Sequence, residues 1–264
     1  YHLVDPSPWP LVTSISALIL AWGFIQFMHE EKTLLFYIGS IAVGVSCILW
    51  WRDVILESEQ GGFHNKVVQI GLRYGMIFFI ASEVMFFSAW FWAFFDVAFY
   101  PGENSAELIG RKESLGGVFP PQEIELIPPF GIPLLNTFIL LASGGTITWA
   151  HHALRQNDNK NFMIFLFLTI LLGVIFTGFQ GYEYQHATFS IDEGIYPSTF
   201  YMATGFHGAH VIIGTIFLIV CFIRGLRGGM NPKKHLGFEF AAWYWHFVDV
   251  VWLFLFAAIY IWGS

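Results

Sequence analysis

The chain has 264 residues, of which 56% are hydrophobic, 19% are aromatic and only 12% are charged. A soluble domain carries about a quarter charged residues, so this composition excludes a water-covered globule and indicates that lipid covers much of the surface. The formal net charge of −7 comes from a few charges in short links, which excludes the basic face of a protein that binds nucleic acid.

Seven stretches of the chain are apolar over at least the length of about 20 residues that a membrane-spanning helix needs. They cover residues 11–29, 34–56, 67–97, 131–153, 160–184, 197–224 and 237–262. The links between them are short except for 98–130, which is rich in proline and glycine and is predicted to be one long surface loop. The sequence therefore predicts an all-α membrane protein in which residues 1–264 form a single integral membrane domain.

The lysines and arginines predict how these helices are oriented, because links on the inner side of a membrane are enriched in them. With seven spans, the N-terminal side holds Arg52, Lys66, Arg73, Arg155, Lys160, Arg224, Arg227, Lys233 and Lys234. The opposite side holds only Lys32, Arg111 and Lys112. We therefore predict an inside N-terminus and an outside C-terminus, with the loop 98–130 on the outer side.

The third predicted helix contains "FFIASEVMFFSAWFW" (78–92), in which Glu83 is the only charged residue. Glu83 follows Arg73 by ten residues, or about 15 Å along a helix, so it lies near the bilayer centre if Arg73 marks the inner headgroups. An intramembrane acid is by default a functional-site hypothesis. The alternative is a protonated carboxyl that hydrogen-bonds a neighbouring helix and only helps packing. The residues alone leave both hypotheses open.

The sixth predicted helix contains "GFHGAH", which places His207 and His210 one turn apart on one face. Such a pair could ligate a metal or a haem. In the seventh helix His246 and Asp249 are three residues apart, a spacing that favours a local hydrogen bond. Because His–carboxylate pairs inside a bundle are more often structural than catalytic, we interpret His246 and Asp249 as structural polar groups.

Two further classes of protein remain open on these residues. A proton-coupled transporter would use Glu83, His207 and His210 as a relay, and a membrane cytochrome would bind haem through the histidine pair. The sequence has no phosphate-binding glycine loop, nucleophile elbow or Cys–His metal signature. It also has no internal repeat, which counts against a transporter built from repeated halves.

Small residues on several predicted helices indicate where neighbouring helices pack closely. They are Ser40 with Gly44, the stretch "ASGG" at 142–145, and Gly205 with Ala209. Such patterns are common in membrane proteins and identify no particular function.

Seven blocks of the chain, in order, resemble subunit III of the haem-copper cytochrome c oxidases: "YHLVDPSPWP", "WWRDV", "GLRYGMIFFIASEVMFF", "PLLNTFILLASG", "ITWAHHAL", "STFYMATGFHGAHVIIGTIFLIV" and "GFEFAAWYWHFVDVVWLFLF". The resemblance covers essentially the whole chain. It implies a non-catalytic core subunit without cofactor or metal of its own, since haem and copper belong to subunits I and II. The implied complex transfers electrons from cytochrome c to oxygen and pumps protons, in a bacterial plasma membrane or the mitochondrial inner membrane.

The resemblance also implies a fold, in which the first two helices splay from a bundle of five and enclose a lipid-filled cleft. The family's lipid-contacting positions fall on Glu83, Trp92, Trp51, Arg52, His64, Arg73 and Arg224, and the polar residues His207, His210, Glu239, His246 and Asp249 are structural. One departure is Leu56, in "WWRDVILES", where the family often has a second arginine. One cation that would face lipid headgroups is therefore missing.

Overall fold

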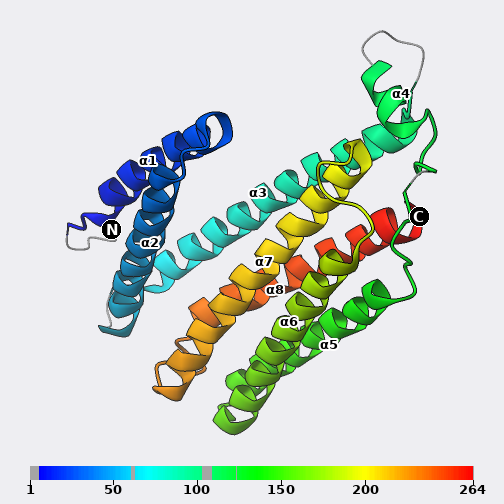
Figure 1. The fold of residues 1–264 in the computed structure, drawn as a ribbon. Coiled ribbons are helices and arrows are strands. Elements are labelled where there is room, and N and C mark those ends of the chain that lie inside the picture. Colours follow the sequence, from blue (N-terminus) through cyan, green and yellow to red (C-terminus); the bar gives the residue numbers. More distant parts are fainter. Residues whose placement is uncertain (1–5, 61–62, 103–108, 123, 264) are drawn as a thin grey trace. The chain divides into compact units, whose positions relative to one another are not determined.

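The computed structural model describes residues 6–60, 63–102, 109–122 and 124–263 (Figure 1). Its helices are α1 (Trp9–Glu30), α2 (Leu34–Gln60), α3 (Lys66–Phe99), α4 (Ile109–Leu115), α5 (Ile132–Arg155), α6 (Asn159–His186), α7 (Ile195–Leu226) and α8 (Leu236–Leu255), the last continued by the π-helical segment η2 (Phe256–Ile261). In this part of the chain α1–α3 and α5–α8 are seven helices long and apolar enough to cross a membrane. The predicted all-α membrane fold is confirmed.

Each predicted span coincides with one of these helices, and most helices extend a few residues further. The α-helix α8 ends at Leu255 rather than at residue 262, and the rest of that span is the π-helical η2. The helix α2 ends at Gln60 rather than at residue 56, because it continues past the apolar stretch into polar residues. The predicted loop 98–130 contains the short helix α4. Residues 103–108 and 123 of that loop, and 1–5 of the first family-like block, lie outside the described residues.

The chain divides into two compact units, Tyr1–Tyr74 and Gly75–Ser264, with the boundary inside α3. In the first unit α1 and α2 pack closely, because Gly39 lies so near α1 that an added Cβ would sit 2.5 Å from Leu20 Cα. The indole N–H of Trp9 also donates a hydrogen bond to the Asp53 carboxylate, which ties the start of α1 to α2. The remaining surface of this pair is largely apolar and exposed.

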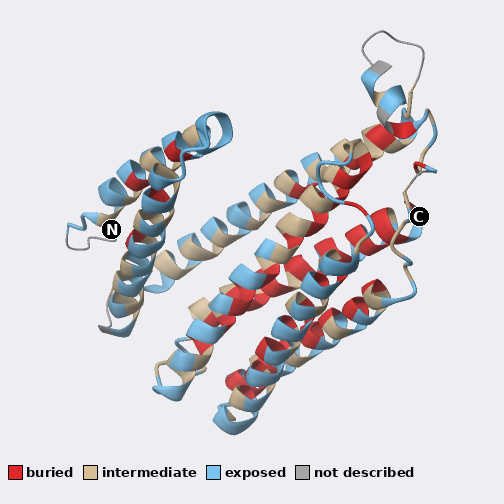
Figure 2. Ribbon diagram, viewed as in Figure 1, coloured by how far each residue is buried: buried red, intermediate tan, exposed pale blue. Residues whose placement is uncertain are grey.

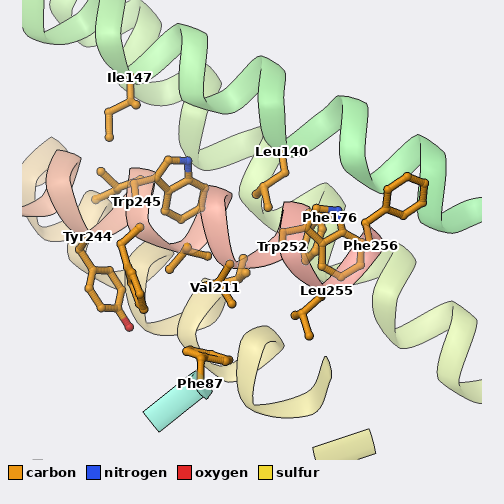
Figure 3. Close-up of a cluster of buried hydrophobic side chains, with 14 of the residues drawn as sticks. Phe87, Leu140, Ile147, Phe176, Val211, Tyr244, Trp245, Trp252, Leu255 and Phe256 are labelled. Atoms are coloured by element: carbon orange, nitrogen blue, oxygen red, sulfur yellow. The ribbon is translucent and has the colours of Figure 1, made fainter. Parts of the chain in front are cut away.

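The second unit is organised around α8. In the most apolar stretch of α8 and η2, 61% of the residues are buried, against 33% in α5 and α7, and Figure 2 shows buried residues concentrated on α8. Trp245 and Trp252 are its largest buried side chains. Figure 3 shows them among Leu140, Phe176 and Val211, which come from α5, α6 and α7. The core of this unit is therefore the surface on which three helices meet α8.

Polar contacts fix the rotation of α8 within this core. Trp245 Nε1 donates to Ser143 Oγ at 2.8 Å, and Trp252 Nε1 donates to Thr137 Oγ1 at 2.9 Å, both on α5. An added Cβ at Gly173 of α6 would lie 2.6 Å from Trp245 Cη2, so a larger residue there would displace the indole. Because glycine has no side chain, Gly173 lets α6 approach Trp245 this closely.

A polar residue also starts α6. The Asp158 carboxylate accepts hydrogen bonds from the backbone N–H of Asn161, at 3.1 Å, and from the Asn161 amide, at 2.6 Å. This is the usual arrangement of an N-cap residue. These two hydrogen bonds lower the pKa of Asp158 from its ordinary value, because they favour the ionised carboxylate.

The helix α4 is attached to the end of α3 by one arginine. Arg111 Nη2 donates to Asp96 Oδ2 at 2.6 Å, and Arg111 Nη1 lies 3.2 Å from Asp96 O and 3.3 Å from Tyr100 O. A cation at the C-terminus of a helix interacts favourably with the carbonyls exposed there. Together with the burial of Leu115, these contacts explain why part of the predicted loop is helical.

Replacing Arg111 by glutamine should loosen α4 without unfolding the bundle. The ion pair is partly exposed to solvent, so we expect a local cost of about 1 kcal/mol, or about fivefold faster amide hydrogen exchange in α4. The matched control is Lys112→Gln, which changes the neighbouring exposed cation and should leave exchange unchanged. Equal exchange in the two variants would show that Arg111 does not hold α4.

Candidate functional site

Glu83 forms a hydrogen-bonded pair with His210. Glu83 Oε2 lies 2.8 Å from His210 Nε2, which joins α3 to α7 inside the second unit. The two side chains keep 21% and 12% of their surface exposed. The other ring nitrogen, His210 Nδ1, faces the carbonyl oxygen of Phe206 at 2.6 Å and therefore donates a hydrogen to it.

This geometry determines how many protons the pair holds. Since Nδ1 carries a hydrogen, the bond between Nε2 and Glu83 contains one further proton. That proton resides either on the carboxyl, beside a neutral imidazole, or on the ring, beside a carboxylate. Both forms are neutral overall, so the pair avoids the cost of an unpaired charge in an apolar region.

Aromatic rings surround this pair. The His210 ring centre lies 4.9 Å from that of Phe87, 5.9 Å from that of Phe86 and 6.3 Å from that of Tyr244. These rings belong to α3 and α8, so the imidazole is held between two helices. The sequence did not pair Glu83 with His210, because 127 residues separate them.

His207 has a different partner, although it lies on the same face of α7. It is fully buried, and its Nε2 donates to the Val248 carbonyl oxygen of α8 at 3.1 Å. Its ring centre lies 5.1 Å from that of Trp252 and 5.7 Å from that of Phe176. The residues that the structure describes contain no group of three or more His, Cys, Asp or Glu placed to hold a metal ion.

His246, Asp249 and Glu239 lie on α8. His246 Nδ1 lies 3.6 Å from Asp249 Oδ2, and His246 Nε2 lies 3.2 Å from Thr148 Oγ1 of α5. An added Cβ at Gly144 would come within 2.5 Å of Asp249 Oδ2, so this glycine lets α5 approach the carboxylate. Glu239 lies in the first turn of α8, where a carboxylate interacts favourably with the helix dipole.

The residues that the resemblance assigns to lipid contact lie in both compact units. The first unit holds Trp51, Arg52, His64 and Arg73, and the second holds Glu83, Trp92 and Arg224. Both tryptophans are largely exposed, Trp51 by 64% and Trp92 by 74%. The Arg224 guanidinium lies next to Gly237 at the start of α8, because a Cβ added to that glycine would be 3.1 Å from Arg224 Nη1.

The structure does not bring Glu83 and Trp92 together on α3. At 3.6 residues per turn, positions nine residues apart lie on opposite sides of a helix, about 180° around its axis. Glu83 points to α7, whereas Trp92 is exposed. Lipid contact by these two residues would therefore involve different faces of α3.

Sequence reasoning missed one buried acid, Glu183, in the last turn of α6. It keeps only 4% of its surface exposed, and its Oε1 accepts hydrogen bonds from Tyr260 Oη at 2.7 Å and from Gln180 Nε2 at 3.1 Å. The sequence feature that could have indicated this polar cluster is the presence of Asn136 and Gln180 inside predicted apolar spans. Glu183 itself lies at the predicted end of a span, where an acid is unremarkable.

Comparison with known proteins gives one result along the whole chain. The family model described as "Cytochrome c oxidase subunit III" matches residues 1–264. Proteins named "Cytochrome c oxidase subunit 3" are 54% identical in Triticum aestivum and 53% identical in Arabidopsis thaliana, each over 266 residues, and 52% identical in Equus asinus over 264 residues. Each alignment covers 100% of this chain and 97% of the relative.

The contacts of the two histidines on α7 lead to a test of their role. Replacing His207 or His210 by glutamine should leave the metal content and visible spectrum of the purified assembly unchanged, because both Nε2 atoms are engaged by protein groups. The control is His152→Gln at the exposed end of α5. Loss of one metal equivalent in either α7 variant, but not in the control, would show that the histidine is a ligand.

Proposed function

The chain belongs to the cytochrome c oxidase subunit III family and is a subunit of that enzyme, and from this premise we propose that it is the oxidase's non-catalytic, lipid-holding subunit. In this proposal subunits I and II carry the haem and copper, and the complex passes electrons from cytochrome c to oxygen while it pumps protons. This chain binds phospholipids and stabilises the catalytic subunit and its proton uptake.

The observation that supports the non-catalytic role is that the Nε2 atoms of both histidines are hydrogen-bonded to protein groups. His207 Nε2 donates to a backbone carbonyl, and both ring nitrogens of His210 have protein partners. A haem ligated by either Nε2 would have to break one of these contacts. A relay through Glu83, His207 and His210 is also disfavoured, since His207 bonds to α8 while Glu83 and His210 bond to each other.

Lipid binding is supported by the surface of the chain. The exposed faces of α1 and α2 are apolar over most of their length, and Trp51 and Trp92 are amphipathic rings of the kind that lie at membrane interfaces. Arg52, Arg73 and Arg224 add guanidinium groups, which bind phosphate through two parallel charge-assisted hydrogen bonds. This combination suits phospholipids with a phosphate near the helix ends.

We place the chain in a bacterial plasma membrane or the mitochondrial inner membrane, with the N-terminus inside. The support is the distribution of lysine and arginine, most of which lie in or beside the links that follow α2, α5 and α7. Arg111 and Lys112 of α4 belong to the opposite, outer side in this orientation.

Replacing Arg224 by alanine should lower the amount of phospholipid that co-purifies with the oxidase, by roughly one molecule per complex, because a phosphate loses its charge-assisted partner. Quantitative mass spectrometry of the extracted lipid measures this change. The matched control is Arg227→Ala, three residues on and more exposed at the end of α7. Unchanged lipid in the Arg224 variant would remove this residue from the proposed site.

Replacing Glu83 by glutamine should leave assembly and electron transfer intact, because the amide keeps the size and can still hydrogen-bond His210. We expect at most a partial loss of proton pumping, or of resistance to inactivation during turnover, measured as protons per electron and as activity against time. A fully assembled complex that no longer reduces oxygen would show that the acid is catalytic, against the proposed function.

A further inference from the structure

The buried acid Glu183 belongs to a chain of hydrogen bonds that links three elements of the second unit. Asn136 Nδ2 of α5 donates to Gln180 Oε1 at 3.4 Å, and Gln180 Nε2 of α6 donates to Glu183 Oε1 at 3.1 Å. Tyr260 Oη of η2 donates to the same Glu183 oxygen at 2.7 Å. All four side chains are buried.

Two oxygen atoms of this hydrogen-bonded network have no hydrogen-bond partner among the described residues. They are Glu183 Oε2 and Asn136 Oδ1, and both are fully shielded by the surrounding protein. Buried polar atoms without a partner are rare, because they lose their bonds to water and gain none in return. Two such atoms in one connected network indicate that the network binds something polar.

The chemistry of Glu183 restricts what that partner can be. An ionised carboxylate needs a hydrogen-bond donor at Oε2, whereas a carboxyl protonated on Oε2 needs an acceptor there. Asn136 Oδ1 needs a donor in either case. Water both donates and accepts, so it satisfies Oε2 in both protonation states, which a purely donating or purely accepting group does not.

The local backbone gives independent support for a built site. Tyr260 lies in the π-helical segment η2, which follows directly on α8. Such segments are uncommon and are frequently found at functional sites. Here the segment aims the Tyr260 hydroxyl at Oε1, so that both protein donors use one oxygen and Oε2 is left without a hydrogen bond from the protein.

An open pocket lies beside the next residue of the chain: Tyr184, which follows Glu183, lines it together with Thr188, Glu193 and Tyr201. Asn136 lies in the first two turns of α5, Glu183 in the last turn of α6 and Tyr260 at the end of η2. The network is therefore close to the helix ends rather than in the middle of the bundle.

We propose that Glu183 is the centre of a buried hydration site, in which an ordered water molecule hydrogen-bonds to Oε2. The site joins α5, α6 and η2. It goes beyond the proposed function and does not depend on it, because it involves neither the lipid-contacting residues nor the Glu83–His210 pair.

A high-resolution electron cryo-microscopy map of the intact oxidase tests this proposal directly. We expect a water peak at about 2.5–3.0 Å from Glu183 Oε2 in the wild type. Glu183→Gln should retain the peak, because an amide still bonds to water, and Glu183→Leu should lose it. The control Glu193→Gln, at the exposed rim of the pocket, should leave the peak unchanged.

Thermal unfolding of the assembled variants gives a second measurement. Glu183→Gln should unfold at nearly the wild-type rate, and Glu183→Leu about tenfold faster, because it strands the remaining polar groups. A dry Oε2 in a wild-type map that resolves other buried waters would overturn the proposal, even if the leucine variant fails to assemble. So would a peak that disappears when choline replaces Na⁺ and K⁺, since the occupant would then be a cation.

Discussion

The second unit depends on the requirement that polar groups inside a membrane find their partners within the protein. Lipid tails offer no hydrogen-bond acceptor, so each buried indole or phenol must meet one on a neighbouring helix. Three such donors lie along α8 and η2 at intervals of about two turns: Trp245, Trp252 and Tyr260. Their acceptors are Ser143, Thr137 and Glu183. Because each donor has one acceptor, the rotation and axial position of α5 and α6 against α8 are determined together.

The same requirement explains the acid on α3. Glu83 is tolerated because His210 completes its hydrogen bonding and because the pair, with its one shared proton, is neutral. Glu83, the residue that the sequence made the strongest functional candidate, therefore also connects α3 to α7 through a hydrogen bond. A substitution that preserves the hydrogen bond and one that breaks it will have different consequences, even though both remove the carboxylate.

The spans could be predicted from sequence because the thickness of the hydrocarbon dictates their length and apolar character. The contacts between them could not, since these depend on rotation about each helix axis. Of the glycines expected at close contacts, Gly144 leaves no room for a Cβ, whereas Gly44 and Gly205 have no neighbour within 4 Å of one. Gly39 and Gly173, which the sequence did not single out, are also in close contact with a neighbouring helix. Small residues show where close packing is allowed, and only the partner helix determines which of them are used.

The first unit shows where internal packing is insufficient. In the most apolar windows of α1 and α2 only 11% of the residues are buried, and the pair is held by close glycine contacts and the bond from Trp9 to Asp53. In a bilayer the apolar surface alone gives two helices little reason to associate with further helices, because lipid is as apolar as they are. Whatever covers α1 and α2 must therefore be selected by shape and by a few polar groups such as Arg52. In the proposed function, phospholipids and a neighbouring subunit of the oxidase would have to meet both conditions.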